Sequence, residues 1–320
     1  MLELFNKFDE SLSKYNKVIL MTHARPDLDG FGSAVALYEY LNGDKEVIFV
    51  KPKLFTNNSL KRALDFYNKD IPYMDEEELL KSDFSDALLI ILDTNSLKLV
   101  ESKDLALKVK NIIVIDHHCL LNNLIEPTEL DIRIKEKSST IEIITEFLKN
   151  KNFKLDKNVL TMLLAGLEVD TNTYNLKTTE ETFKIAGYLV GQGADLILKQ
   201  EILKEPKDEE IRRYELLKNS YEVTDGRYIC VMDDEIYGPV DMSLVAQNLL
   251  KFAGVKVAFA IGKLSDDTIG ISARSMGDIN VGEMMNRLGG GGHLANAACQ
   301  IKGKNIQEVR ESLEEVIKEE

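Results

Sequence analysis

Five short polar motifs in this 320-residue chain carry the side chains that are suited to chemistry. In the first, HARPDLDG, an imidazole and two carboxylates lie close together: His23, Asp27 and Asp29. Two aspartates two positions apart on an extended turn can bind neighbouring metal ions. The alternative is an ordinary turn between a strand and a helix, in which Asp29 only caps the helix.

Three further motifs also follow apolar runs. Asp93 follows ALLIIL in LDTNS, and Asp116, His117 and His118 follow IIVI in IDHH. Adjacent imidazoles behind a carboxylate favour one ring on a metal and the other facing substrate, with the carboxylate orienting a ring. A solvent-facing polar turn is the alternative for IDHH, and a cap or turn role is the alternative for LDTNS. The motif EVDTNTY adds Asp170 after the helix-like run NVLTMLLAGL.

The fifth motif, LGGGGH, consists of four glycines and His293 after another helix-like run. Glycine backbone without side chains can present its N–H groups as an anion-binding nest, and a flexible linker is the alternative. Arg274, at the end of GISAR, can contact a phosphate through two N–H groups or can be a simple surface cation. The four glycines are Gly289, Gly290, Gly291 and Gly292.

The five motifs together supply aspartates and histidines but no thiolate. Oxygen and imidazole donors suit Mn²⁺ or Mg²⁺, with Fe²⁺ or Co²⁺ as alternatives, better than they suit structural zinc. There are more carboxylates than one ion needs. We therefore expect two ions joined by a bridging carboxylate, and hydrolysis of a phosphate ester by metal-bound hydroxide.

Short apolar runs alternate with helix-like segments through the first half of the chain. This alternation predicts an α/β domain with a doubly wound, mainly parallel sheet. Three of the runs end in His or Asp, and the carboxyl ends of parallel strands share one edge, so we expect the motifs to converge there. Helices are expected at 32–41 and 140–149. The expected strands are 17–22, 46–50, 87–92 and 112–115.

The length of the chain exceeds what one hydrophobic core comfortably supports, so two domains are expected. We predict a metal-binding domain at 1–190, a charged helical linker at 191–221 and a smaller α+β domain at 222–320. Pro206 is expected to break the linker helix or to open its second part. Strands are expected in the smaller domain at 228–232, 255–261 and 268–273.

The overall charge limits the classes of partner. Lys and Arg number 40 against 54 Asp and Glu, which gives a net charge of −14 and argues against binding of long nucleic acids. A small anionic ligand is compatible where metal ions reverse the charge locally. No apolar run is long enough for a membrane span, and the three cysteines lack CxxC spacing. A cytoplasmic protein without a membrane partner is expected, and a homodimer is compatible with the sequence.

The motifs resemble, in order and spacing, those of the DHH phosphoesterase family. HARPDLDGFGS, LDTNS, IDHH and EVDTNTY look like the four N-terminal motifs of that family. The segment SARSMGDINVGEMMNRLGGGGHLANAACQI is similar to its associated C-terminal substrate-binding domain. Within the family, LDTNSLKLVES, KSST and GISARSMGDINV are most like the catalytic module of cyclic-di-AMP phosphodiesterases.

This resemblance implies a set of metal ligands. One Mn²⁺ would be held by His23, Asp27 and Asp93. The second would be held by four residues, with Asp93 bridging the two ions: Asp29, Asp93, His117 and Asp170.

The resemblance also implies roles beyond the ligands. His118 would face the scissile phosphate as a charge stabiliser or acid, and Asp116 would orient the histidines. Arg274, the glycine loop and His293 would hold the far phosphate or nucleotide.

The activity expected from the resemblance is Mn²⁺-dependent hydrolysis of cyclic di-AMP to pApA, of linear dinucleotides, or of short RNA to mononucleotides. One alternative is an oligoribonuclease or pAp phosphatase without activity on cyclic dinucleotides. Another is an inorganic pyrophosphatase or exopolyphosphatase, which uses a similar metal core. A non-catalytic cyclic-dinucleotide sensor would need broken metal motifs, and none of these motifs looks broken.

Overall fold

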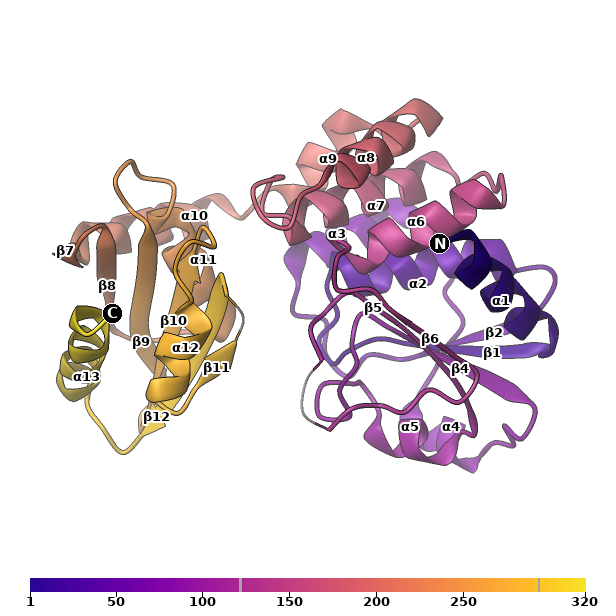
Figure 1. Cartoon of the computed structure of the whole chain (residues 1–320), viewed down its shortest axis with the longest axis horizontal. Coiled ribbons are helices and arrows are strands. Elements are labelled where there is room, and N and C mark those ends of the chain that lie inside the picture. The colour runs from indigo at the N-terminus through magenta and orange to yellow at the C-terminus, as the bar shows by residue number, and fades with distance from the viewer. Residues whose placement is uncertain (121–122, 293) are drawn as a thin grey trace. The chain divides into compact units, whose positions relative to one another are not determined.

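A computed structural model describes residues 1–120, 123–292 and 294–320. The chain forms two units, Met1–Lys204 and Glu205–Glu320 (Figure 1). The stretch expected as a linker helix contains two helices, α9 (Leu196–Leu203) and α10 (Lys207–Leu216). Pro206 directly precedes α10, where its fixed φ suits a helix start.

The first unit is built on a six-stranded parallel sheet in the order β3-β2-β1-β4-β5-β6. Chain order reverses beside β1, since β2 pairs with one of its sides and β4 with the other. Such a switch point opens a crevice at the carboxyl ends of the strands. The strands are β1 (Lys17–Met21), β2 (Glu46–Val50), β3 (Tyr73–Met74), β4 (Ala87–Leu92), β5 (Asn111–Asp116) and β6 (Leu130–Arg133).

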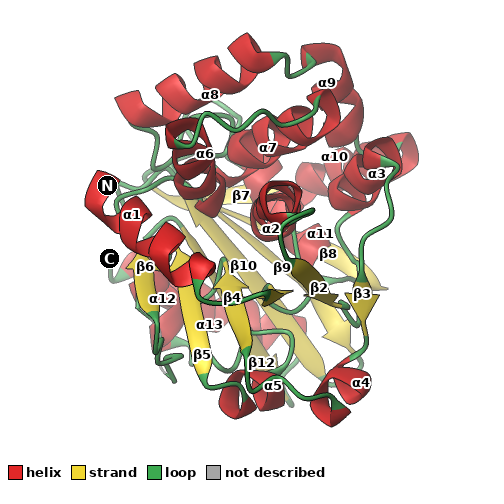
Figure 2. Ribbon diagram, turned by 90° about the vertical axis from the view of Figure 1, so that its right-hand side faces the viewer, coloured by secondary structure: helices red, strands yellow, loops and turns green. Residues whose placement is uncertain are grey.

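Helices cover both faces of this sheet, with α2, α6 and α7 on one face and α4 and α5 on the other (Figure 2). Strand β4 shows why both faces are covered: Leu88 and Ile90 belong to one apolar cluster and Leu89 and Ile91 to the other. The predicted doubly wound α/β fold is therefore confirmed. The helices are α1 (Leu2–Ser13), α2 (Leu28–Leu41), α3 (Asn58–Tyr67), α4 (Glu76–Lys81), α5 (Lys103–Lys108), α6 (Thr140–Asn150), α7 (Lys157–Asp170), α8 (Glu180–Gln192) and α9.

The second unit is the expected α+β domain, with a mixed sheet in the order β11-β12-β10-β9-β8-β7. Strands β8 and β9 pair in parallel, and the other neighbours pair antiparallel. None of the helices formed by the described residues combines the length and apolar composition of a membrane span. The remaining elements are η1 (Leu217–Asn219), β7 (Ser220–Thr224), β8 (Arg227–Ile236), α11 (Pro239–Leu249), β9 (Val257–Ser265), β10 (Thr268–Ser275), α12 (Val281–Arg287), β11 (Gly291–Gly292), β12 (Asn296–Lys302) and α13 (Ile306–Lys318).

Candidate metal centre

Three neighbouring strands deliver the polar motifs to one edge of the first sheet. Met21 of β1 pairs with Ile91 of β4, and Leu92 of β4 pairs with Ile115 of β5. Because these pairings are parallel and lie at the strand ends, the segments that follow the three strands emerge side by side. The predicted convergence of the first three motifs therefore follows from the sheet register.

The first donor group consists of His23, Asp27 and Asp93, whose ligand atoms all lie within 4.8 Å of one another. The Nε2 atom of His23 is 3.7 Å from Oδ1 of Asp27 and 3.4 Å from Oδ2 of Asp93. Burial opposes protonation of this imidazole, but the two carboxylates outweigh burial and raise the pKa of His23 to about 12. The group thus concentrates negative charge around one ring nitrogen.

A second donor group consists of Asp29, His117 and Asp170. The Nε2 atom of His117 is 3.7 Å from Oδ2 of Asp29 and 3.3 Å from Oδ2 of Asp170. It is also 3.5 Å from Oδ1 of Asp93, whose other oxygen faces His23. Asp93 therefore lies between the two groups, as a bridging ligand must.

The donor spacing fits divalent ions better than direct hydrogen bonds. Ligands 2.0–2.2 Å from a shared ion lie about 3–3.5 Å from each other. His117 is only 2% exposed, yet its Nε2 has no hydrogen-bond partner among the described residues. A buried polar atom without such a partner is costly, so this lone pair calls for a ligand outside the protein.

Three carboxyl groups of the centre have raised pKa values, which indicates that too little positive charge lies near them. Burial and the Asp27 charge raise the pKa of Asp29 to about 6. Burial and the Asp29 charge hold the pKa values of Asp93 and Asp170 well above their usual range. Bound cations would reverse these shifts, because a positive ion favours the ionised form of each carboxyl.

The backbone helps to aim the bridging carboxylate. Asp93 has a left-handed backbone (φ 63°), a conformation uncommon outside glycine and enriched at functional sites. Gly30 of α2 lies directly against it: a Cβ at Gly30 would be 3.1 Å from both Cβ and Oδ2 of Asp93. Glycine at this position therefore lets the first turn of α2 approach the end of β4.

Asp116 is not a member of these donor groups, although its partner His118 forms a further possible group with Asp93 and His117. Its Oδ1 lies 2.8 Å from Nδ1 of His118, and its Oδ2 accepts a 2.5 Å hydrogen bond from Asn95 Nδ2. Burial raises the pKa of Asp116, but the hydrogen bond and charge of His118, the charge of His117 and the Asn95 hydrogen bond together outweigh burial and lower it. An ionised Asp116 held in this way orients the His118 ring. The LDTNS motif contained Asn95, but its type alone did not indicate this role.

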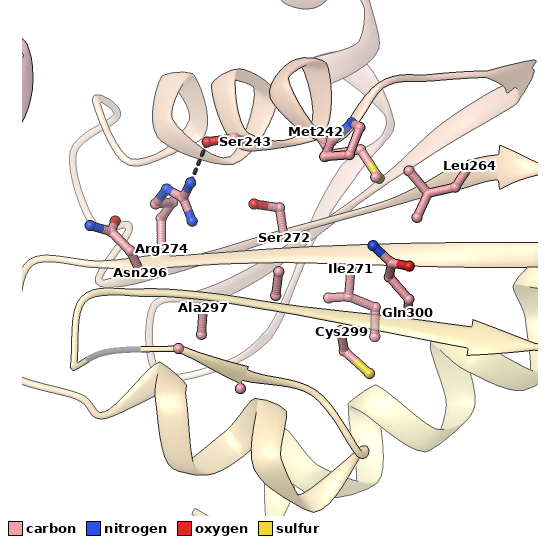
Figure 3. A pocket seen from close by; sticks show the side chains of 14 residues that line it. Met242, Ser243, Leu264, Ile271, Ser272, Arg274, Asn296, Ala297, Cys299 and Gln300 are labelled. Atoms are coloured by element: carbon pink, nitrogen blue, oxygen red, sulfur yellow. Dashed lines mark hydrogen bonds between the residues drawn. The ribbon is translucent and has the colours of Figure 1, made fainter. Parts of the chain in front are cut away.

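Arg274 lies in the second unit, on β10. Its guanidinium donates to the backbone oxygen of Ala273. It also donates to the Ser243 hydroxyl (Figure 3). No carboxylate among the described residues pairs with it, and burial lowers its pKa to about 10. Arg274 lines a pocket of about 360 Å³ together with Gly291, Gly292 and other residues, and none of the described residues in this lining is acidic.

The glycine loop is more ordered than the open nest expected from its sequence. The N–H of Gly289 donates to Asn286 and that of Gly290 to Met285, so both amides close the end of α12. Gly291 and Gly292 form β11 and pair with β12. A Cβ at Gly290 would lie 2.3 Å from the Ala298 oxygen, so close packing explains this glycine. His293 lies outside the described residues.

Two curated relatives cover nearly the whole chain. It is 36% identical over 316 residues to cyclic-di-AMP phosphodiesterase GdpP of Geobacillus thermodenitrificans, across 96% of this chain and 48% of the relative. It is 33% identical over 312 residues to cyclic-di-AMP phosphodiesterase PdeA of Listeria monocytogenes, across 95% of this chain and 48% of the relative. The chain thus spans about half the length of these relatives.

The fold recurs in a solved structure. An exopolyphosphatase-related protein from Bacteroides fragilis superposes with a TM-score of 0.79 at 20% identity, across 100% of this chain and 96% of that one. Residues 17–167 match the N-terminal domain of the DHH family, and residues 226–319 match the DHHA1 domain. The motifs, the parallel sheet and these two matches agree: the chain belongs to the DHH family and carries a DHHA1 domain.

Proposed function

We propose that this protein is a Mn²⁺-dependent phosphodiesterase that opens cyclic di-AMP to pApA and cleaves linear dinucleotides or short RNA to mononucleotides. The observation that carries the proposal is the position of Asp93 between two donor groups, with one oxygen facing His23 and the other facing His117. The names of the relatives support the substrate class.

In this proposal His23, Asp27 and Asp93 hold one ion. The second ion is held by four residues: Asp29, Asp93, His117 and Asp170. Two bound Mn²⁺ ions would supply Lewis acidity for the phosphate and for the attacking water. Oxygen and imidazole donors without thiolates suit Mn²⁺ and Mg²⁺, and Fe²⁺ or Co²⁺ are alternatives for the same donor set.

The remaining residues bind and orient the substrate. Asp116 fixes the ring of His118 through Nδ1, which leaves this imidazole oriented to stabilise charge or to protonate the leaving oxygen. Arg274 supplies a partly desolvated guanidinium for a phosphate of the substrate, in a pocket whose described lining residues include no competing acid. We propose that the dinucleotide's size and phosphate positions are recognised at this pocket.

The deciding experiment is chromatography of cyclic di-AMP, cyclic di-GMP and pApA after incubation with the protein and Mn²⁺. We expect pApA to form from cyclic di-AMP and AMP to form on longer incubation, with neither product in excess chelator. If pApA is hydrolysed and cyclic di-AMP is not, the proposed substrate would be a linear dinucleotide and not a cyclic one. Release of phosphate from pyrophosphate, with every dinucleotide intact, would overturn the proposal.

A further inference from the structure

The N-terminus of α6 holds two of the proposed metal ligands from behind. The backbone N–H of Thr140 donates to Oδ2 of Asp29 at 2.8 Å, and that of Ile141 donates to Oδ1 at 2.8 Å. The Thr140 hydroxyl donates to Oδ1 of Asp93 at 3.0 Å. One helix end therefore contacts carboxylates that arrive from α2 and from the end of β4.

These contacts suit a carboxylate that must stay ionised and fixed. Free N–H groups at a helix start carry partial positive charge and favour an anion. The two bonds to Asp29 favour its ionised form, against burial and the charge of Asp27. The hydroxyl bond to Asp93 occupies one side of Oδ1, so it restricts the direction in which that oxygen can face a cation.

A buried network holds this end of α6 in place. Glu142, which is only 1% exposed, accepts hydrogen bonds from the Ser138 backbone at 3.1 Å and from Lys137 Nζ at 2.9 Å. It also accepts one from the Thr182 hydroxyl of α8 at 3.0 Å. The Ser139 side chain caps α6 through the Glu142 amide. The helix start is thereby anchored to its own preceding loop and to a neighbouring helix.

We propose that Thr140 is a positioning residue for the metal centre: its hydroxyl sets the orientation of Asp93, while the start of α6 sets that of Asp29. This inference rests on the proposed two-metal centre. Thr140 need not touch substrate or ion to act in this way. Removal of a group that orients a metal ligand typically costs 10–100-fold in affinity.

The test is titration of the chelated full-length chain with Mn²⁺ by isothermal calorimetry. Thr140→Val removes the hydroxyl at nearly constant shape, and we expect the Mn²⁺ dissociation constant to rise by about 10–100-fold. Thr140→Ser restores a hydroxyl and should recover most of the affinity. Thr145→Val is the matched control, since Thr145 is a buried residue of the same helix whose hydroxyl has no hydrogen-bond partner among the described residues.

A second readout separates positioning from general stability. Electron paramagnetic resonance of the loaded protein should show coupled Mn²⁺ ions in wild type and in Thr145→Val, and weakened coupling in Thr140→Val. If Thr140→Val does not fold, Thr140→Ala is titrated in its place. If metal-free Thr140→Val has a lower melting temperature but unchanged Mn²⁺ affinity and coupling, the positioning role of Thr140 is refuted. The proposed metal centre would not be affected by that result. Absence of Mn²⁺ binding by wild type would overturn the proposed metal centre as well.

Discussion

The candidate metal centre of the first unit and the pocket of the second unit are opposite in charge. At the edge of the parallel sheet, carboxylates converge on His23 and His117, and burial together with the charge of Asp29 holds the pKa values of Asp93 and Asp170 well above their usual range. In the pocket beside β10, the Arg274 guanidinium is half-buried, and none of the described residues that line the pocket is acidic. Burying charge without a counter-charge is costly. The carboxylate cluster therefore indicates a bound cation, and the Arg274 pocket indicates a bound anion.

This contrast explains how a protein with a net charge of −14 could bind the proposed anionic substrate. The carboxylates favour cations, and those cations in turn attract phosphate, while Arg274 attracts phosphate directly. Attraction at both places is local, so it does not depend on the overall field of the molecule. Variants at the candidate metal centre and at the Arg274 pocket test whether these two sites have different functions.

The largest expected effect is that of Asp93→Asn at the metal centre. The amide keeps the shape of the side chain but removes the charge that faces both donor groups. Removal of a residue that only orients a metal ligand typically lowers metal affinity or activity by up to about 100-fold. Removal of a ligand shared by two ions should therefore lower kcat by more than that on every substrate. Steady-state assays on cyclic di-AMP and on a small chromogenic phosphodiester measure this. Mn²⁺-dependent turnover near the wild-type rate would refute the assignment.

Arg274→Ala tests the pocket of the second unit. A hydrogen bond to a charged group is worth about 1.5–3 kcal/mol, so KM for a dinucleotide should rise by about 10–100-fold. The loss on the small chromogenic substrate should be much smaller, because that substrate has no second phosphate. Lys263→Ala is the control, since Lys263 lies on the neighbouring strand β9 in a surface pair with Asp234. Equal losses of activity on the dinucleotide and on the small chromogenic substrate would contradict a separate substrate-binding role for the Arg274 pocket.

Gly30→Ala probes the close contact between α2 and Asp93. The added Cβ would lie 3.1 Å from the Asp93 carboxylate, and overpacking of this kind costs about 1–3 kcal/mol. We expect weaker Mn²⁺ binding together with a lower melting temperature. Gly187→Ala in α8 is the control, because a Cβ there meets nothing within 4 Å and should stabilise the helix slightly. Unchanged Mn²⁺ affinity in Gly30→Ala would show that this contact is unimportant.

The smallest expected effect is a pH dependence of stabilisation by Mn²⁺. The pKa of Asp29 is raised to about 6 by burial and Asp27, so below that pH a proton competes with the cation. In the metal-free protein the stability contributed by this carboxyl is present below its unfolded pKa and is lost as pH rises through about 6. Both effects make the Mn²⁺-induced gain in melting temperature larger at high pH.

Calorimetry with and without Mn²⁺ measures this gain at about pH 5.5 and pH 7.5. We expect the gain to be at least about 3 °C larger at the higher pH. Groups that affect folding but not metal binding cancel in the difference. A gain that is larger at the lower pH would contradict the assignment of these carboxyls as ligands.

The sequence predicted the elements that carry strong local signals. Strands 46–50 and 87–92 have the predicted bounds, because buried parallel strands are continuous apolar runs. Helix α2 begins four residues before the predicted 32–41, since Asp27 caps it and the polar motif itself forms its first turn. Strands β3, β6 and β11 were not predicted, because segments of two to four residues show no periodicity. The longer strands β7 and β12 were also missed.

Only part of the candidate site could be predicted from the sequence. The motifs identified the donor residues because Asp and His types carry chemistry on their own. Thr140 and Asn95 carry no such signal, and their partners are 111, 47 and 21 positions away along the chain. Pairings over that distance are decided by helix packing and strand register, so they required the structure.

The cap of α2 has a consequence for observing the metal centre. Asp27 belongs to the first donor group, and its Oδ1 also accepts hydrogen bonds from the amides of Asp29 and Gly30, at 3.0 and 3.1 Å. A cation that immobilises this carboxylate would also hold the first turn of the helix closed. Hydrogen exchange of two backbone amides thus becomes a local gauge of ion occupancy, readable without any substrate.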